Sequence, residues 1–265
     1  MSLIDTHCHL NFDSYDPDRD AVIERAAWAE VTRIINPAVD LDTSRAAVDL
    51  ARRYRGIYAA VGVHPNSSAD FDVKWLDELA ELAGQSKVVA IGEIGLDYHW
   101  DDSPKAKQFE AFEAQLDLAA KLELPVIIHN REASDDVIAI LERWANDLPF
   151  ALKERPGVMH SFSAPLEIAE RAVAIGFYLG FTGPITYKNA DELRRVAARV
   201  PLERIVVETD GPFLTPTPRR GKRNEPAYVP LIVERLATLR QISTEAMGAA
   251  TTANAERLFG LERNS

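Results

Sequence analysis

The sequence predicts an α/β fold, a single (β/α)8 TIM barrel that carries extra helices at its C-terminal end. The chain has 265 residues, and a (β/α)8 barrel typically closes with roughly 250. Short apolar runs rich in β-branched residues alternate with longer segments of helical periodicity, which is typical of βαβ units around a parallel sheet. Eight such repeats follow one another, so one domain covering residues 1–265 is the simplest organisation.

The expected strands recur at intervals of about thirty residues, the length of a strand, a helix and two loops. They lie at residues 3–7, 33–36, 57–63, 88–93, 126–129, 157–160, 177–181 and 205–208. Between them apolar side chains recur every three to four residues, as at Phe109, Phe112 and Leu116, which predicts helices that pack one face against the barrel. Two further helical segments, 229–239 and 243–259, follow the last strand and are expected to close the barrel.

An open, doubly wound parallel sheet is the alternative fold, because it shows the same alternation of strands and helices. Eight repeats favour the closed barrel. In addition, no Gly-x-Gly-x-x-Gly turn follows the first strand, so the sequence offers no dinucleotide-binding signal there.

The composition predicts a globular cytoplasmic protein. Apolar residues make up 46% of the chain and charged residues 27%, which allows a sizeable core and a solvated surface. No apolar run approaches the ~20 residues that cross a bilayer, and the first residues do not resemble a signal peptide. A single cysteine, Cys8, cannot form an internal disulfide, which fits a reducing compartment. We therefore expect no membrane association, and nothing in the sequence indicates an obligate protein partner.

The net charge restricts how nucleic acid could be bound. A formal charge of −11 and a pI near 5.1 exclude a protein that coats nucleic acid with a broad basic surface. An anionic substrate must therefore be bound locally. Two divalent cations would add about four positive charges at one point and dominate the field there, so the net charge does not exclude a phosphate substrate.

Polar residues follow the apolar runs where five of the expected strands end, and function in this fold lies at the carboxyl ends of the strands. The residues at these ends are His7, His9, Glu93, His129, His160 and Asp210. Four imidazoles and two carboxylates at one barrel mouth would be costly to bury without cations. The set therefore predicts a metal site.

Some of these residues, taken singly, are weak evidence for a metal site. His7 and His9 are two residues apart, so in an extended backbone both imidazoles can reach one cation while Cys8 points away. His129 and His160, taken singly, also suit hydrogen-bonded histidines of the core. The metal prediction depends on the whole set.

Glu93 is the candidate bridge between two cations, because a carboxylate can bind one metal through each oxygen. The expected ligand sets are His7, His9, Glu93 and Asp210 for one ion, and Glu93, His129 and His160 for the other. These sets leave coordination positions open for water and substrate, as a catalytic site requires. Nitrogen and oxygen ligands suit zinc, magnesium and manganese, so the identity of the two divalent cations stays open.

Together the motifs resemble the TatD-type deoxyribonuclease family of metal-dependent hydrolases. The matching stretches are residues 4–10 (IDTHCHL), 61–65 (VGVHP), 91–98 (IGEIGLDY), 125–129 (PVIIH) with Arg131, 160–163 (HSFS), 208–212 (ETDGP) and 223–226 (RNEP). Their order covers nearly the whole chain, which makes the resemblance more specific than any single motif.

The resemblance implies a TIM barrel, a two-cation centre with the ligands named above, and hydrolysis of phosphodiester bonds in DNA, commonly from an end. The expected partner is therefore DNA, single-stranded or at its ends. Three residues depart from the pattern usual in the family, Ala164, Gly211 and His99, and none of them is an expected ligand.

Catalytic and substrate-binding roles are also expected around the metal site. We expect Glu93 and Asp210 to act in catalysis, with Asp210 accepting a proton from the attacking water or serving only as a ligand. Arg131 lies two residues beyond His129, and its planar guanidinium suits a phosphate; a salt bridge to a loop carboxylate is the alternative. His64 ends the third strand and either contacts substrate or makes a structural hydrogen bond.

A dense basic cluster follows the last strand, formed by Arg219, Arg220, Lys222 and Arg223. This cluster either binds phosphate groups of the substrate or forms an ordinary solvated loop. Asn224 is placed to orient this loop, and Arg223 and Asn224 are its candidate substrate-binding residues.

Two other functions are compatible with the same residues. A two-metal barrel can hydrolyse a different ester or an amide, and an aminoacyl-tRNA deacylase is one example. A glutamate at the bridge and the basic cluster favour the phosphodiester. The non-enzymatic alternative is a nucleic-acid or metal-binding module with structural cations, but a structural site is expected to be closed.

Overall fold

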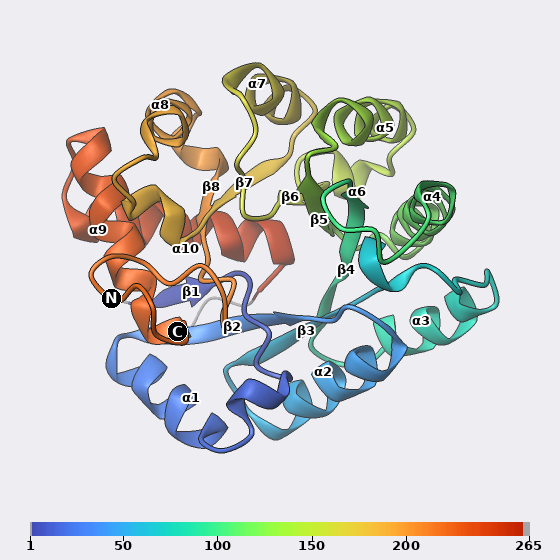
Figure 1. The fold of residues 1–265 in the computed structure, drawn as a ribbon, viewed down its shortest axis with the longest axis horizontal. Coiled ribbons are helices and arrows are strands. Elements are labelled where there is room, and N and C mark those ends of the chain that lie inside the picture. The colour runs from blue at the N-terminus through green and yellow to red at the C-terminus, as the bar shows by residue number, and fades with distance from the viewer. Residues whose placement is uncertain (1, 262–265) are drawn as a thin grey trace.

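The computed structural model describes residues 2–261, in which eight parallel strands curve into a barrel surrounded by helices (Figure 1). The strands are β1 (Leu3–Asp5), β2 (Val31–Pro37), β3 (Ile57–Val61), β4 (Val88–Asp97), β5 (Val126–Arg131), β6 (Gly157–Met159), β7 (Tyr178–Phe181) and β8 (Ile205–Val207). They pair strictly in chain order. The predicted TIM barrel is confirmed, and the doubly wound sheet is excluded because its strand order would reverse.

Backbone contacts just beyond β1 and β8 join the two ends of the sheet. Asp210 N donates to His7 O at 2.8 Å, and His9 N donates to Gly211 O at 2.8 Å. Cys8 and Gly211 form an isolated parallel bridge. The barrel thus closes through the segments that carry three of the expected metal ligands.

The outer layer consists of helices that follow the strands. They are α1 (Arg19–Trp28), α2 (Leu41–Arg53), α3 (Trp75–Ala83), α4 (Lys105–Leu122), α5 (Ser134–Asn146), α6 (Phe150–Lys153), α7 (Leu166–Ala174), α8 (Asp191–Arg199), α9 (Val229–Arg240) and α10 (Thr244–Phe259). Helix α2 begins with a capping box between Asp40 and Thr43. The two predicted C-terminal helices are confirmed as α9 and α10. Among residues 2–261, no helix is both long enough and apolar enough to cross a membrane.

The core has two layers. One layer of the core consists of apolar side chains that fill the space between the strands and the surrounding helices. The inner cluster takes one side chain from each strand, namely Ile4, Ile35, Ala60, Ala90, Ile127, Val158, Tyr178 and Val206. The last turn of α10 completes it with Leu258 and Phe259. Asn254 of the same helix donates to Leu202 O and Ile205 O, both at 2.8 Å, so α10 closes the barrel at the amino ends of the strands.

Strand ends differ from the sequence prediction where the site begins. The expected strands at 3–7, 57–63, 157–160 and 205–208 end one or two residues early in the structure. By contrast, β4 continues four residues beyond Glu93 to Asp97. Gly95 permits this, because its φ is +147° and a Cβ there would lie 2.0 Å from His129 O. The predicted single domain, 1–265, also includes Met1 and 262–265, which lie outside the described residues.

Helix α10 should carry part of the stability of the barrel. We expect Leu258→Ala to lower the free energy of unfolding by about 2–5 kcal/mol, because a fully buried leucine of the inner cluster leaves a cavity. Urea denaturation measures this. Phe150→Ala is the control, since Phe150 is 92% exposed and its loss should cost less than about 0.5 kcal/mol. Equal effects of the two substitutions would contradict the role of α10.

Candidate metal centre

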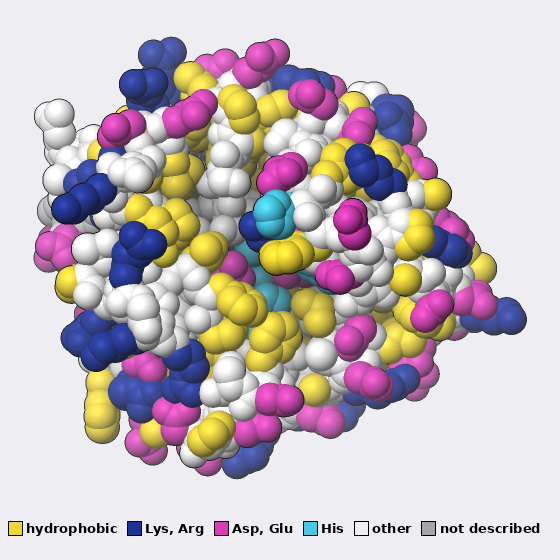
Figure 2. Space-filling view, viewed as in Figure 1, with side chains coloured by type: hydrophobic (Ala, Val, Ile, Leu, Met, Phe, Trp, Pro, Cys, Tyr) yellow, Lys and Arg dark blue, Asp and Glu magenta, His cyan; other side chains and the backbone are white. Residues whose placement is uncertain are grey.

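An open pocket of about 770 Å³ lies at the carboxyl ends of the strands. In the view down the barrel, histidine side chains lie at the bottom of this hollow and apolar side chains surround it (Figure 2). The sequence-predicted residues that line it are His9, His64, Glu93, His129, Arg131, His160 and Asp210. His7 is fully buried and contacts the same cluster. The structure thus brings together all six residues that the sequence predicts as ligands.

Glu93 lies at the centre of the cluster and turns its two oxygens toward different histidines. Its Oε2 lies 3.3 Å from His7 Nε2 and 3.6 Å from His9 Nε2. Its Oε1 lies 2.7 Å from His129 Nδ1 and 3.0 Å from His160 Nε2. The division matches the two expected ligand sets.

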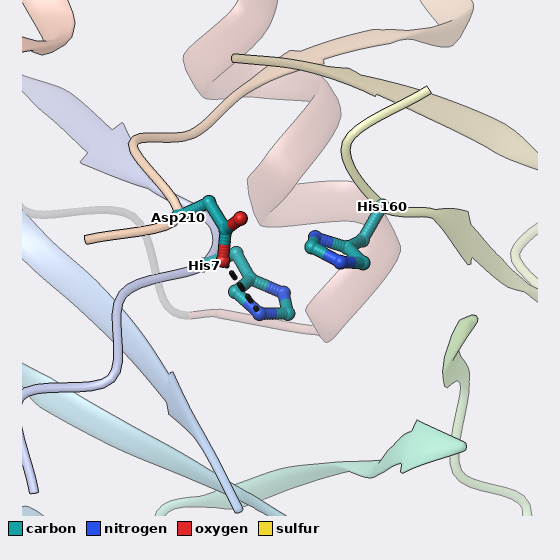
Figure 3. Close-up of side chains that lie close together, drawn as sticks. All are labelled: His7, His160 and Asp210. Carbon is teal, nitrogen blue, oxygen red and sulfur yellow. Dashed lines mark ion pairs between the residues drawn. The ribbon is translucent and has the colours of Figure 1, made fainter. Parts of the chain in front are cut away.

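Asp210 approaches the cluster from the loop after β8. Its Oδ1 lies 3.7 Å from Nε2 of both His7 and His9. Figure 3 shows that His7, His160 and Asp210 come from three different strand ends and point toward one another. The rings of His7 and His160 stack with centroids 3.8 Å apart.

Three overlapping groups in the described residues have ligand atoms close enough to share a cation, each within 4.8 Å: His7 with His160 and Asp210, His7 with His9 and Glu93, and His64 with Glu93 and His129. The cluster can therefore hold metal.

The electrostatics of the cluster keep its carboxylate charged and some of its histidines neutral. Burial acts to raise the pKa of Glu93, but His160, His7 and His64 outweigh it and hold that pKa well below its usual value. Burial lowers the pKa of His9 to about 3, with His7 acting in the same direction. Neutral imidazole and ionised carboxylate are the forms that bind metal.

Hydrogen bonds on the far side of the rings fix their tautomers. His9 Nδ1 lies 3.2 Å from Pro37 O and must donate to it, which leaves the Nε2 lone pair facing the cluster. His129 Nε2 lies 2.9 Å from Asp97 Oδ2, so its Nδ1 is the atom directed at Glu93. These carboxylate and carbonyl partners are typical of metal-binding histidines, and the donor set fits a divalent cation.

In His64 the ring nitrogen on the far side from the cluster accepts a hydrogen bond and does not donate one. Its Nδ1 accepts a hydrogen bond from Asn66 N at 3.1 Å. Burial, followed by the effect of His129, lowers its pKa to about 3, so the ring is neutral and carries its proton on Nε2. That N–H lies 3.6 Å from Glu93 Oε1 and faces the pocket, which suits donation to a substrate oxygen better than metal binding.

Two buried carboxylates support the histidines and were not predicted from the sequence. Besides contacting His129, Asp97 accepts from His99 N at 2.9 Å and from Trp100 N at 3.1 Å. Glu208 accepts from Ser161 N, and its Oε1 lies 3.5 Å from His160 Nδ1. The only sequence signal for Glu208 is its place beside Asp210 at the end of the last strand.

Arg131 lies on the exposed rim of the pocket. Its guanidinium is 5.6 Å from the centre of the Trp100 ring. Among residues 2–261 it has no carboxylate within salt-bridge distance, so the salt-bridge alternative is not formed. Its charge faces the pocket opening without a partner.

Arg223 and Asn224 do not line the pocket, in contrast to the substrate-binding prediction. Arg223 Nη1 lies 2.8 Å from Asp18 Oδ1, and its guanidinium covers the Tyr15 ring at 4.6 Å. Asn224 is fully buried. Its Nδ2 donates to Thr209 O at 2.7 Å and to Phe213 O at 2.6 Å. The loop therefore folds back on itself here, and Asn224 orients it.

Cys8 agrees with the expectation that it points away from the metal site. Its Sγ lies 3.8 Å from Tyr15 Oη and 3.7 Å from Gly211 O. Burial raises the pKa of the thiol well above its usual value, so the thiolate that a metal would need is disfavoured.

Comparisons with known proteins give a consistent result. The chain matches the family described as TatD related DNase over residues 4–260. It is similar to YabD of Bacillus subtilis (strain 168), described as an uncharacterized metal-dependent hydrolase, with 45% identity over 257 residues that cover 97% of this chain and 98% of YabD. It is also similar to a protein of Escherichia fergusonii named 3'-5' ssDNA/RNA exonuclease TatD, with 37% identity over 264 residues, 98% of this chain and 99% of that protein.

Among solved structures, that of YJJV, a TatD homolog from Escherichia coli K12, superposes with a TM-score of 0.90 at 36% sequence identity. The match covers 98% of both chains.

The loop that holds Asp210 should depend on the buried amide of Asn224. We expect Asn224→Asp to lower the free energy of unfolding by about 1–3 kcal/mol, because a carboxylate of the same size cannot donate to the two carbonyls. Urea denaturation measures this. Lys222→Ala, an exposed change in the same loop, should cost less than about 0.5 kcal/mol. A neutral Asn224→Asp substitution would show that the amide does not hold the loop.

Proposed function

Because the chain belongs to the TatD related DNase family and is therefore a metal-dependent hydrolase, we propose that it is a two-metal exonuclease that releases nucleotides from the ends of single-stranded DNA. Membership of a hydrolase family sets aside the non-enzymatic alternative. The name of the Escherichia fergusonii relative, an ssDNA/RNA exonuclease, supports a nucleic acid as the substrate.

The orientation of Glu93 carries this proposal. His7, His9, Glu93 and Asp210 would hold one cation, and Glu93, His129 and His160 would hold the other, because the two Glu93 oxygens face different histidines. When bound, such a pair acidifies water and neutralises phosphate charge. Zinc, magnesium and manganese all suit these nitrogen and oxygen donors.

Asp210 is the proposed proton acceptor. Burial raises the pKa of its carboxyl group to about 6. Its carboxylate faces the proposed centre beside His7 and His9, where it would accept a proton from a water held there. Its side chain also lines the pocket, within reach of a water there. His64 Nε2–H and Arg131 are placed to hold the phosphate oxygens.

The walls of the pocket favour unpaired bases. Trp100, from the loop after β4, is 51% exposed, and Phe213, from the loop after β8, is 53% exposed. Both line the pocket. In an eight-stranded barrel the loops after β4 and β8 face each other, so the two rings lie on opposite walls. Aromatic rings stack on bases regardless of sequence, but only when those bases are unpaired.

A cytoplasmic location remains part of the proposal. It is supported by the single cysteine, Cys8, which is buried and free.

The first test is nucleotide release from labelled single-stranded DNA with added magnesium, manganese or zinc. We expect metal-dependent release of mononucleotides. Glu93→Gln should reduce it more than about 100-fold, because loss of a partner that merely orients a ligand already costs 10–100-fold. Metal content and melting temperature are measured in parallel.

Glu132→Gln is the matched control for that test, since Glu132 is exposed, follows the last residue of β5 and pairs with His99. Its activity should equal that of the unmodified protein. Bound metal without nucleotide release would reject the nuclease and direct the search to other esters and amides, with aminoacyl-tRNA as the next substrate.

Asp210→Asn separates the two roles of Asp210. If this side chain accepts the proton, kcat should fall about 10²–10⁴-fold while both metals remain bound. Metal analysis together with single-turnover kinetics measures this. A variant that binds both metals and turns over normally would rule out the assignment of the base.

A further inference from the structure

A second surface groove, of about 540 Å³, lies beside the pocket. It is bordered by the 3-10 helix η3 (Gly183–Thr186), by α8, by α9 and by the loop after β8. Its lining includes Tyr187, Lys188, Arg194, Thr217 and Arg235. We call it the basic groove. None of the roles proposed above uses it.

The basic groove adjoins the pocket along two segments, each of which contributes residues to both. On η3, Pro184 lines the pocket and Thr186 lines the groove. On α8, the same division falls between Leu193 and Arg194. Consecutive Cα atoms are about 3.8 Å apart, so the groove begins within roughly 8 Å of the pocket wall. A strand that leaves the pocket on this side would therefore reach the groove within one or two nucleotides.

Several basic side chains of the groove and the adjoining loop form no ion pair in the part of the chain that the structure describes. Among residues 2–261, no ion pair is formed by Lys188, Arg219, Arg220, Lys222 or Arg235. Such a concentration is unexpected in a chain with a net charge of −11. Figure 2 shows basic side chains on the side of the hollow where Figure 1 places α9. Unpaired cations beside a cleft attract an anionic ligand.

One of these cations has an unsatisfied donor. Arg235 Nε is buried and has no hydrogen-bond partner among the described residues. The side chain of Arg235 lines the groove, so its guanidinium has donor capacity that the described residues leave unused. Glu234 is the one carboxylate in the lining, and Arg194 is already paired with Asp191.

Aromatic rings accompany the charges. The guanidinium of Arg220 lies 4.1 Å from the centre of the Tyr187 ring, and that of Arg219 lies 5.8 Å from the Tyr228 ring. Basic side chains combined with aromatic rings are typical of surfaces that bind single strands without sequence preference, since bases stack and phosphates pair with the cations.

We propose that the basic groove is an exosite for the single strand that continues from the pocket, and that it binds the phosphates of nucleotides beyond the scissile bond. The inference rests on the proposed function for its class of substrate. It follows that affinity increases with strand length, and that this gain is lost in high salt because it depends on phosphate contacts. Short substrates that fill only the pocket gain nothing from the groove.

The test compares Lys188→Ala/Arg220→Ala with a control that removes the same charge elsewhere, Arg55→Ala/Lys121→Ala. All four side chains are exposed. The control residues precede β3 and β5, so they lie at the opposite end of the barrel. Anisotropy with a labelled 20-mer and a labelled trimer, both made with hydrolysis-resistant phosphorothioate linkages so that the cations stay in place, gives affinity as a function of salt.

We expect the groove variant to bind the 20-mer about tenfold more weakly and the trimer normally. Its slope of log affinity against log salt should fall by about 1.4, because each single-strand phosphate contact contributes about 0.7. The control should match the unmodified protein. Equal 20-mer binding by both variants, or equal loss for the trimer, would overturn the exosite.

The same variants separate this inference from the proposed nuclease. Release of nucleotides with 20-mer binding unaffected by the groove substitutions would reject the exosite alone. Groove-dependent 20-mer binding without nucleotide release under any metal would support the exosite while rejecting the nuclease.

Discussion

The structure of the site depends on one buried carboxylate, Glu93, held ionised among imidazoles. An isolated carboxylate at this depth would be neutralised by desolvation. The histidines contributed by β1, β5 and β6 prevent this, because they hold the pKa of Glu93 well below its usual value. Strands distant in sequence must therefore meet at one point, and a closed parallel barrel is the arrangement that brings their carboxyl ends together. Both the barrel fold and the cluster around Glu93 therefore require the carboxyl ends of these strands to meet.

Closure of the barrel positions the two ends of that arrangement. Asp5 accepts hydrogen bonds from Thr209 N at 2.9 Å and from His7 N at 3.2 Å. It thereby fastens the segment that carries His7 and His9 to the segment that carries Asp210. Burial raises the pKa of Asp5 to about 7, and the hydrogen bonds from Thr209 and His7 act in the opposite direction by favouring the carboxylate. Helix α10 closes the barrel at the amino ends of the strands, where Leu258 and Phe259 complete the inner cluster. Helix α10 thus packs at the amino ends of the strands, and the candidate metal centre lies at their carboxyl ends.

The sequence predicted the barrel and the six converging residues because both follow from local patterns: apolar runs mark strands, and polar residues after them mark the functional end. It could not place Asp97, because β4 extends past Glu93 only through the close approach that Gly95 allows. It assigned Arg223 and Asn224 to substrate binding, whereas neither lines the pocket, for a similar reason. Their loop folds back onto Asp18 and Thr209, and those contacts, 205 and 15 residues away in sequence, have no local signal. The positions of Arg223 and Asn224 depend on the conformation of this loop, which local sequence patterns do not predict.

An acidic chain can bind a polyanion only if its positive charge is concentrated. A net charge of −11 repels nucleic acid at long range, but at physiological salt that repulsion is screened beyond about 8 Å. Inside that distance local groups decide. Arg131 lies at the rim of the pocket and the unpaired cations lie in and beside the basic groove, and aromatic rings accompany both. A narrow path of this kind fits the flexible backbone of a single strand, whose bases are free to stack, better than a rigid duplex. Under the proposed function, acidic surfaces elsewhere would limit non-specific binding of nucleic acid, and the overall charge would contribute to selectivity.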